Sequence, residues 1–372
     1  MHNSRPDPYC LLIQFFSSVA IVSSWIYIPE IAKNLHASNL EIGLVVGSYS
    51  SAFFVSSILF GRASDMYGRK LFLKWGLFAS FVFFFLQYFS KSYVFLLITR
   101  ILSGFCIGIF PAALIALIYE TDGRLGRFSS YGALGWSIGI YISGVIAEIF
   151  GIYIPFIQSS LLFLLSFLAS LGIKETPHRI HSIPLFPKDI FVRNWSLYIA
   201  FLFRHTGANV TWTFWILYLK DLGASSFWQA AIIGINPTLQ FFIMFFFTDT
   251  KRGEIMLSLG FLFSVLTFLL YSVVQNYLQI IPIQFLLALS WSFIYVGSLK
   301  VLAGKNVERA TAVGLFNSTM STSMVIGPFI AGFFMSSVEN FRLLMLFSAL
   351  LSFSGFIIYQ LGLTQRKKRI IQ

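Results

Sequence analysis

The sequence predicts an all-α membrane protein with twelve transmembrane helices, arranged as two pseudo-symmetric bundles of six with both termini in the cytoplasm. Three observations predict this class: the composition, a series of long apolar runs, and a repeat that relates the two halves. The chain has 372 residues, of which 57% are hydrophobic and only 11% are charged, whereas soluble domains carry about 25% charged residues. So few charges could not give a soluble domain a wettable surface.

Twelve apolar runs are long enough to cross a bilayer, since about 20 apolar residues span its hydrocarbon core. Lipid offers no hydrogen-bond partners to the backbone, so each run is expected to be an α-helix rather than a barrel strand. The runs cover residues 9–33, 41–61, 71–90, 93–118, 128–150, 153–172, 195–219, 226–248, 255–274, 277–299, 309–336 and 340–362.

The positive charges predict the orientation of these spans. With the termini inside, 20 of the 26 Lys and Arg residues fall in cytoplasmic segments and 4 in outer segments, and short cytoplasmic loops are enriched in these residues. The same bias accounts for the net charge of +12, so no nucleic-acid partner is expected. The protein is predicted to be a multi-pass protein of the plasma membrane, in contact with the lipid bilayer.

A repeat divides the chain into two halves. Shifting the sequence by 187 positions aligns Trp25 with Trp212 and Gly47 with Gly234, and after a short gap Asp65 aligns with Asp249. The register continues over half the chain, which indicates two similar six-helix units. The predicted domains are an N-terminal bundle at 1–172, a cytoplasmic linker at 173–194 and a C-terminal bundle at 195–372.

The segment 61–70 joins the second and third runs and is expected to be a tight basic hairpin. Glycine permits close approach and positive φ at Gly61 and Gly68, and Asp65 is placed to cap the helix that follows. Arg69 and Lys70 place the segment on the cytoplasmic side. On the residues alone, the segment is a basic turn with a helix cap.

The pattern G-x-x-x-D-x-x-G-R-K in 61–70 resembles the loop 2–3 signature of the major facilitator superfamily of secondary transporters. The resemblance implies two rocking bundles, alternating access, and a gate-side latch at Asp65, Gly68 and Arg69 that favours the outward-open state. Met66 departs from the family pattern, where a base is usual. The counterpart around Asp249 is shorter, so the latch is expected to be asymmetric.

The fourth run carries an arginine in a glycine-rich pattern. Arg100, Gly104 and Gly108 recur at helical spacing and share one face, and a buried arginine in a membrane needs water, a partner or a ligand. The pattern resembles the family's helix 4 motif, whose arginine lines the cavity and is often tied to proton coupling. The alternative is an arginine that reaches out to the membrane surface.

Arg204 and His205 lie well inside the seventh run, near the expected midplane of the bilayer. Ionisable residues at that depth are candidates for substrate or ion binding, and the alternative is a structural pair between helices. The resemblance implies a cavity lined by helices 1, 4, 7 and 10. Further candidates on those helices are Trp25, Asn209, Trp212, Gln284 and Tyr295.

Small residues at helical spacing predict close helix packing. Gly104 and Gly108 belong to this group, as do Gly135 and Gly139 in the fifth run. The Gly-Pro pair that many antiporters of the family carry in helix 5 is incomplete here, and such a pair occurs instead at Gly327 and Pro328. The difference weakens an antiporter assignment.

The acids are the clearest negative evidence. None of the 14 lies deep in the first run, where many drug–proton antiporters of the family keep a carboxylate, while Arg100 and Arg204 have no evident acidic partner. This favours a small organic solute with an anionic group. A multidrug–proton antiporter is the runner-up, and a non-transporting membrane sensor or scaffold is the alternative of another class.

No motif for ATP hydrolysis, metal binding or covalent catalysis stands in the sequence. No enzyme activity, cofactor or metal is therefore expected. The expected partners are a small-molecule substrate and, where transport is coupled, protons, and the protein is expected to be a monomer.

Overall fold

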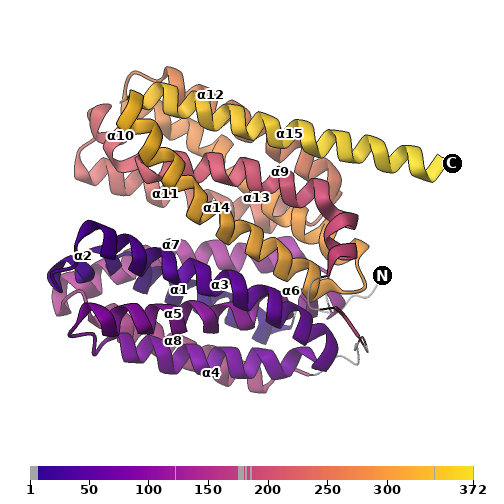
Figure 1. The fold of residues 1–372 in the computed structure, drawn as a ribbon, viewed down its shortest axis with the longest axis horizontal. Coiled ribbons are helices and arrows are strands. Elements are labelled where there is room, and N and C mark those ends of the chain that lie inside the picture. Colours follow the sequence, from indigo (N-terminus) through magenta and orange to yellow (C-terminus); the bar gives the residue numbers. More distant parts are fainter. Residues whose placement is uncertain are drawn as a thin grey trace. The chain divides into compact units, whose positions relative to one another are not determined.

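The computed structural model describes residues 7–371 except 122, 175–179, 181, 185–186 and 339. Within these ranges all regular elements are helices, fifteen α-helices and one 3-10 turn. The helices gather into two compact units (Figure 1), Met1–Pro187 with Ala303–Ser318, and Lys188–Leu302 with Thr319–Gln372. Arg5, Arg179 and the side chains of the basic tail 366–369, which contribute to the predicted cytoplasmic positive charge, lie outside the described part.

The first unit is built from eight helices and the beginning of a ninth. Its tightest neighbours are α3 with α5, α1 with α7 and α8, and α4 with α5 and α8. The helices are α1 (Pro8–Trp25), α2 (Ile28–Asn34), α3 (Asn39–Tyr67), α4 (Arg69–Gln87), α5 (Tyr93–Ile109), α6 (Pro111–Thr121), α7 (Leu125–Phe150), α8 (Ile154–Leu171) and the first turns of α14 (Arg309–Val338).

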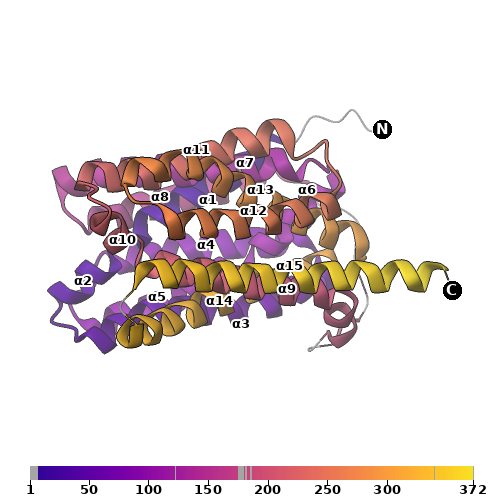
Figure 2. The same cartoon turned by 90° about the horizontal axis from the view of Figure 1, so that it is seen from above.

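In the second unit, the last helix packs along the first and also contacts α12. Figure 2 shows α15 running beside α9 over much of its length. The helices are α9 (Lys188–Thr213), α10 (Trp215–Asp221), α11 (Ser226–Phe247), α12 (Gly253–Val273), α13 (Ile280–Lys305) as far as Leu302, α15 (Phe341–Ile371) and the remainder of α14, with the short η1 (Tyr277–Gln279) before α13.

Ten helical segments of the described chain are long and apolar enough to cross a membrane. The two other runs expected from the sequence, 195–219 and 226–248, are also helical, as α9 with α10 and as α11. α9 begins at Lys188 and includes Asp189, Arg193 and Arg204. The prediction of an all-α membrane protein is confirmed.

The prediction that residues 61–70 form a connecting hairpin loop is wrong, because most of them are helical. α3 continues to Tyr67 and α4 begins at Arg69, so Gly68 alone separates the two helices, with a φ of 105° that suits glycine. Loss of hydrophobicity after Phe60 marks the end of the apolar run, but charged side chains do not stop a helix. The helix ends where the backbone turns.

The fourth run, expected to be one helix over 93–118, is divided at Phe110 into α5 and α6. Pro111 is the first residue of α6, and proline has no N–H to donate to the preceding turn, so the helix breaks there. The chain changes direction at this break. The end of α6, with Glu120, then lies at the same end of the unit as Asp65, since Arg69 bonds to both.

Candidate functional site

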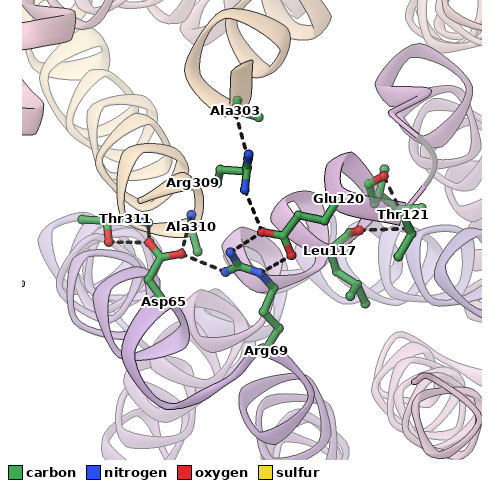
Figure 3. Close-up of polar contacts among 10 residues, drawn as sticks. Asp65, Arg69, Leu117, Glu120, Thr121, Ala303, Arg309, Ala310 and Thr311 are labelled. Atoms are coloured by element: carbon green, nitrogen blue, oxygen red, sulfur yellow. Dashed lines mark hydrogen bonds and ion pairs between the residues drawn. The ribbon is translucent and has the colours of Figure 1, made fainter. Parts of the chain in front are cut away.

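Asp65 lies in the last turn of α3 and is fully buried. Its carboxylate accepts hydrogen bonds from the backbone N–H groups of Ala310 (3.2 Å) and Thr311 (2.7 Å), and from the Thr311 hydroxyl (2.6 Å). These N–H groups belong to the first turn of α14, where a helix has no internal acceptors and its dipole favours negative charge. Asp65 therefore caps α14, and the expected cap on α4 is wrong (Figure 3).

Arg69 connects this cap to a second carboxylate. Its Nη1 donates to Asp65 (2.9 Å), while Nε and Nη2 donate to the two oxygens of Glu120 (2.9 and 2.6 Å). Arg309 also reaches Glu120 (3.1 Å), and its guanidinium lies 5.3 Å from the centre of the Tyr119 ring. Figure 3 shows this chain of two acids and two bases. The charges alternate in sign, so that the fully buried Asp65 and Arg69 are paired, as buried charges require.

The segment between the two halves also contacts this corner. The backbone N–H of Ile180 donates to the Asp65 carbonyl (3.0 Å), and Nε of Arg62 donates to the Ile183 carbonyl (2.5 Å). Lys70, the last residue of the signature, lies half-buried at the start of α4. The corner thus ties together segments from four places in the sequence.

The corresponding corner in the second unit is built differently. Lys300 of α13 donates to the backbone carbonyls of Thr248 (2.7 Å), Asp249 (2.9 Å) and Lys251 (3.1 Å). These carbonyls follow the end of α11, where a cation satisfies orphan carbonyls and complements the dipole. A lysine on backbone carbonyls therefore holds this corner.

Arg100 of α5 lies over the ring of Tyr49 of α3, with its guanidinium carbon 4.0 Å from the ring centre. The side chain is 1% exposed, and Nε and Nη2 have no hydrogen-bond partner within the described residues. A guanidinium that reached the membrane surface would be exposed, so the position favours an interior role. The electrostatic attraction of the ring partly offsets the cost of burying the charge.

Two glycines of α5 set the distance to α3. A Cβ at Gly104 would collide with the backbone of Tyr49, and one at Gly108 would lie 2.7 Å from Cβ of Ser56. The helices are in direct backbone contact here, as small residues permit in membranes. This contact places the Tyr49 ring against Arg100.

Gly104→Ala is expected to destabilise the protein by about 1–3 kcal/mol, because an extra carbon in a packed contact forces the backbones apart. Gly47→Ala is the matched control on α3, since a Cβ there has no atom within 4 Å. Thermal unfolding of the two purified variants checks the difference. Equal unfolding temperatures would contradict the close contact between α3 and α5.

Arg204 of α9 is 1% exposed and lies among neutral groups. Its Nε donates to the hydroxyl of Ser264 (2.7 Å) and its Nη2 to that of Ser290 (3.3 Å), while the guanidinium carbon lies 5.5 Å from the centre of the Trp291 ring. No carboxylate of the described chain pairs with this guanidinium. A buried charge held only by hydroxyls and a ring is well placed to attract an anion.

His205, the next residue, lies between aromatic rings. Its ring stacks on Phe201 (centroids 5.0 Å apart) and on Trp291 (5.2 Å), and Trp291 stacks in turn on Tyr295 (5.5 Å). Arg204, His205 and Tyr295, three of the residues predicted from the sequence, are thus brought together around Trp291. Trp291 itself was not among the candidates predicted from the sequence.

The remaining candidates lie elsewhere. Trp212 packs on Trp215 and Phe268, and Gln284 donates to the hydroxyl of Tyr271 (3.1 Å). The amide of Asn209 donates to the carbonyl of His205 in its own helix (2.8 Å). Trp25, at the end of α1, is 48% exposed.

The glycines predicted for packing lie against neighbouring helices. A Cβ at Gly135 would lie 2.6 Å from the Phe15 carbonyl, one at Gly139 would collide with Val22, and one at Gly327 would collide with Asn209. Pro328 lies inside α14 directly after Gly327.

Several residues of these sites could not be predicted from the sequence. Thr311 and Arg309 are ordinary residues at a helix start, Tyr49 lies in an apolar run, and Ser264 and Ser290 are two serines among many. Only Glu120 gave a signal, as an acid at the end of a run in a chain with few acids.

Comparison with known proteins supports a transport function. An uncharacterized MFS-type transporter of Methanocaldococcus jannaschii is 27% identical over 324 residues, 81% of this chain and 84% of that protein. The quinolone resistance protein NorA of Staphylococcus aureus is 24% identical over 328 residues, 82% of this chain and 83% of NorA. The crystal structure of the human organic anion transporter MFSD10 (TETRAN) matches with a TM-score of 0.82 at 14% identity, over 95% of this chain and 98% of that one, which shows the fold.

The apolar helices and these likenesses define a multi-pass transporter of the cell membrane. The sequence profile of the Major Facilitator Superfamily matches residues 10–304, and the chain belongs to that superfamily. The resemblance first seen in the segment 61–70 is thereby confirmed. Proteins of this superfamily are transporters of small molecules rather than enzymes.

Proposed function

We propose that this protein is a secondary active transporter that moves a small organic anion by alternating access, with Arg204 binding the anionic group. The observation that carries the proposal is the environment of Arg204: a buried guanidinium with two serine hydroxyls and an indole ring as its partners. An anionic substrate would supply the charge-assisted hydrogen bonds that hydroxyls cannot. Arg100, beside Tyr49, is a second candidate of the same chemistry in the other unit.

Alternating access draws support from the helix contacts around Asp65. A buried carboxylate that caps α14 favours the arrangement in which it is found, and movement of α14 away from α3 would expose it to water. The cap can therefore hold one state of a transport cycle without making it permanent. The energy source is a gradient of protons or of a second solute.

Arg204→Ala is expected to reduce anion uptake into proteoliposomes at least tenfold, since one charge-assisted hydrogen bond is worth about 1.5–3 kcal/mol. Candidate substrates are first found by a thermal-shift screen of anions, sugars and cationic drugs. Arg204→Lys should recover part of the uptake, because lysine keeps the charge but not the planar fork. Arg193→Ala, which removes an exposed arginine from the same helix, is the control.

If Arg204→Ala and Arg100→Ala both transport the identified anion as well as the unaltered protein does, the anion site lies elsewhere. A protein that no solute stabilises and that moves none would instead support the sensor or scaffold alternative.

A multidrug–proton antiporter is the second candidate, because NorA, a quinolone resistance protein, is similar over most of the chain. The described first helix, α1, carries no acid between Pro8 and Trp25, so proton coupling would have to use another group. Uptake that ignores an imposed pH gradient would argue against antiport with protons. A cationic drug transported in preference to anions would favour it.

A further inference from the structure

The second unit holds a cluster of four aromatic rings beside Arg204. Phe201 and His205 come from α9, and Trp291 and Tyr295 from α13. The Phe201–His205, His205–Trp291 and Trp291–Tyr295 ring planes are inclined by 26°, 25° and 19°, whereas the Phe201 and Trp291 planes are inclined by 46° at 6.3 Å. Three of the four contacts are thus close to parallel, one of the two arrangements that aromatic pairs prefer.

The guanidinium of Arg204 is anchored at one nitrogen and loosely held at another. The Nε bond to Ser264 is 2.7 Å long, whereas the Nη2 contact with Ser290 is 3.3 Å, beyond the usual range for such a bond. Ser290 already donates its hydroxyl hydrogen to the carbonyl of Gly260 (2.9 Å). A ligand carboxylate could therefore replace Ser290 as the acceptor for Nη2 with little loss of hydrogen-bond energy, while the Ser264 hydroxyl keeps the guanidinium in place.

His205 adds a polar group with no partner. Its side chain is 7% exposed, and neither ring nitrogen has a hydrogen-bond partner within the described residues. A neutral imidazole carries one N–H donor, and leaving it unsatisfied in a buried place costs free energy. A ligand oxygen held by Arg204 from the same helix turn would satisfy that donor.

Trp291 lies next to both Arg204 and His205. Its ring lies 5.2 Å from His205 and 5.5 Å from the guanidinium carbon of Arg204, and the residue is only partly buried. The chemistry offered is a cation with a flat aromatic surface next to it.

We propose that Arg204, His205 and Trp291 form a binding site for a planar aromatic carboxylate. The carboxylate takes the Nη edge of Arg204 and the N–H of His205, and the aromatic ring of the ligand packs against Trp291. The inference rests on the proposed function and narrows its substrate class, because an aliphatic carboxylate would gain the ion pair but not the ring contact.

Isothermal titration of the full-length protein in detergent tests this inference with two probes, 2-naphthoate and cyclohexanecarboxylate. The unaltered protein is expected to bind 2-naphthoate about tenfold more tightly, the size of one good aromatic contact. Trp291→Leu should bring that ratio to about one. Trp291→Phe should keep part of the preference, which also shows that the position tolerates substitution.

Trp195→Leu is the matched control, since Trp195 lies on α9 but is exposed, and its ratio should equal that of the unaltered protein. If the unaltered protein binds both probes equally, or if Trp291→Leu keeps the preference, the aromatic site is wrong while the anion proposal stands. If neither probe binds, the anion proposal and the aromatic site fail together.

Discussion

Asp65→Ala is expected to abolish transport and to destabilise the protein by about 3–5 kcal/mol, the cost of breaking a buried ion pair by removing one partner. The carboxylate is fully buried and satisfies Arg69 together with the N–H groups of Ala310 and Thr311. Without it, two helix N–H groups and one arginine nitrogen lose their acceptor. Uptake into proteoliposomes and thermal unfolding measure the two effects.

Two further variants separate charge from shape at this position. Asp65→Asn keeps an oxygen for the N–H groups of α14 but places an amide where Arg69 needs an acceptor, so an intermediate loss is expected. Asp249→Ala changes the repeat counterpart, which contributes its backbone carbonyl to Lys300 and is only partly buried. Its loss should be much smaller, and equal losses at Asp65 and Asp249 would contradict the asymmetry between the two corners.

The architecture could be predicted because bilayer thickness dictates the length of a span and the side chains dictate where each span lies. Gly68 was also predictable, since a tight junction between two helices requires a backbone conformation that glycine adopts without strain. The junction itself was mistaken for a loop because polarity and helix termination are different properties. Segment 61–67 is polar and still helical.

The partner of Asp65 could not be predicted, because Thr311 is 246 residues away along the chain. Helical periodicity shows which face of a helix is special, but not which distant helix meets it. The same limit applies to Arg204: its isolation from acids was visible in the sequence, while Ser264 and Ser290 became identifiable only as neighbours in space. Sequence patterns found Asp65 and Arg204 but missed Thr311, Ser264 and Ser290.

Gly314→Leu is expected to reduce transport at least tenfold, because α14 and α3 touch backbone to backbone where it lies. A Cβ at Gly314 would collide with the carbonyl of Ser57 and lie 3.2 Å from Cα of Gly61, and one at Gly61 would lie 2.7 Å from the Ala310 carbonyl. No side chain there can move aside, so a leucine must push the first turns of α14 away from α3. The same displacement pulls the helix start off the carboxylate of Asp65.

Gly332→Leu provides the control in the same helix, since a Cβ at Gly332 has no atom within 4 Å. It changes the helix composition identically, and its transport and unfolding temperature should stay close to those of the unaltered protein. Gly314→Ala should lie between the two, because a single methyl group calls for a smaller displacement. A graded loss from glycine through alanine to leucine at 314, absent at 332, would show that transport needs this close contact between α3 and α14. A flat response at 314 would mean that the cap at Asp65 forms without that contact and that the glycine pair serves packing alone.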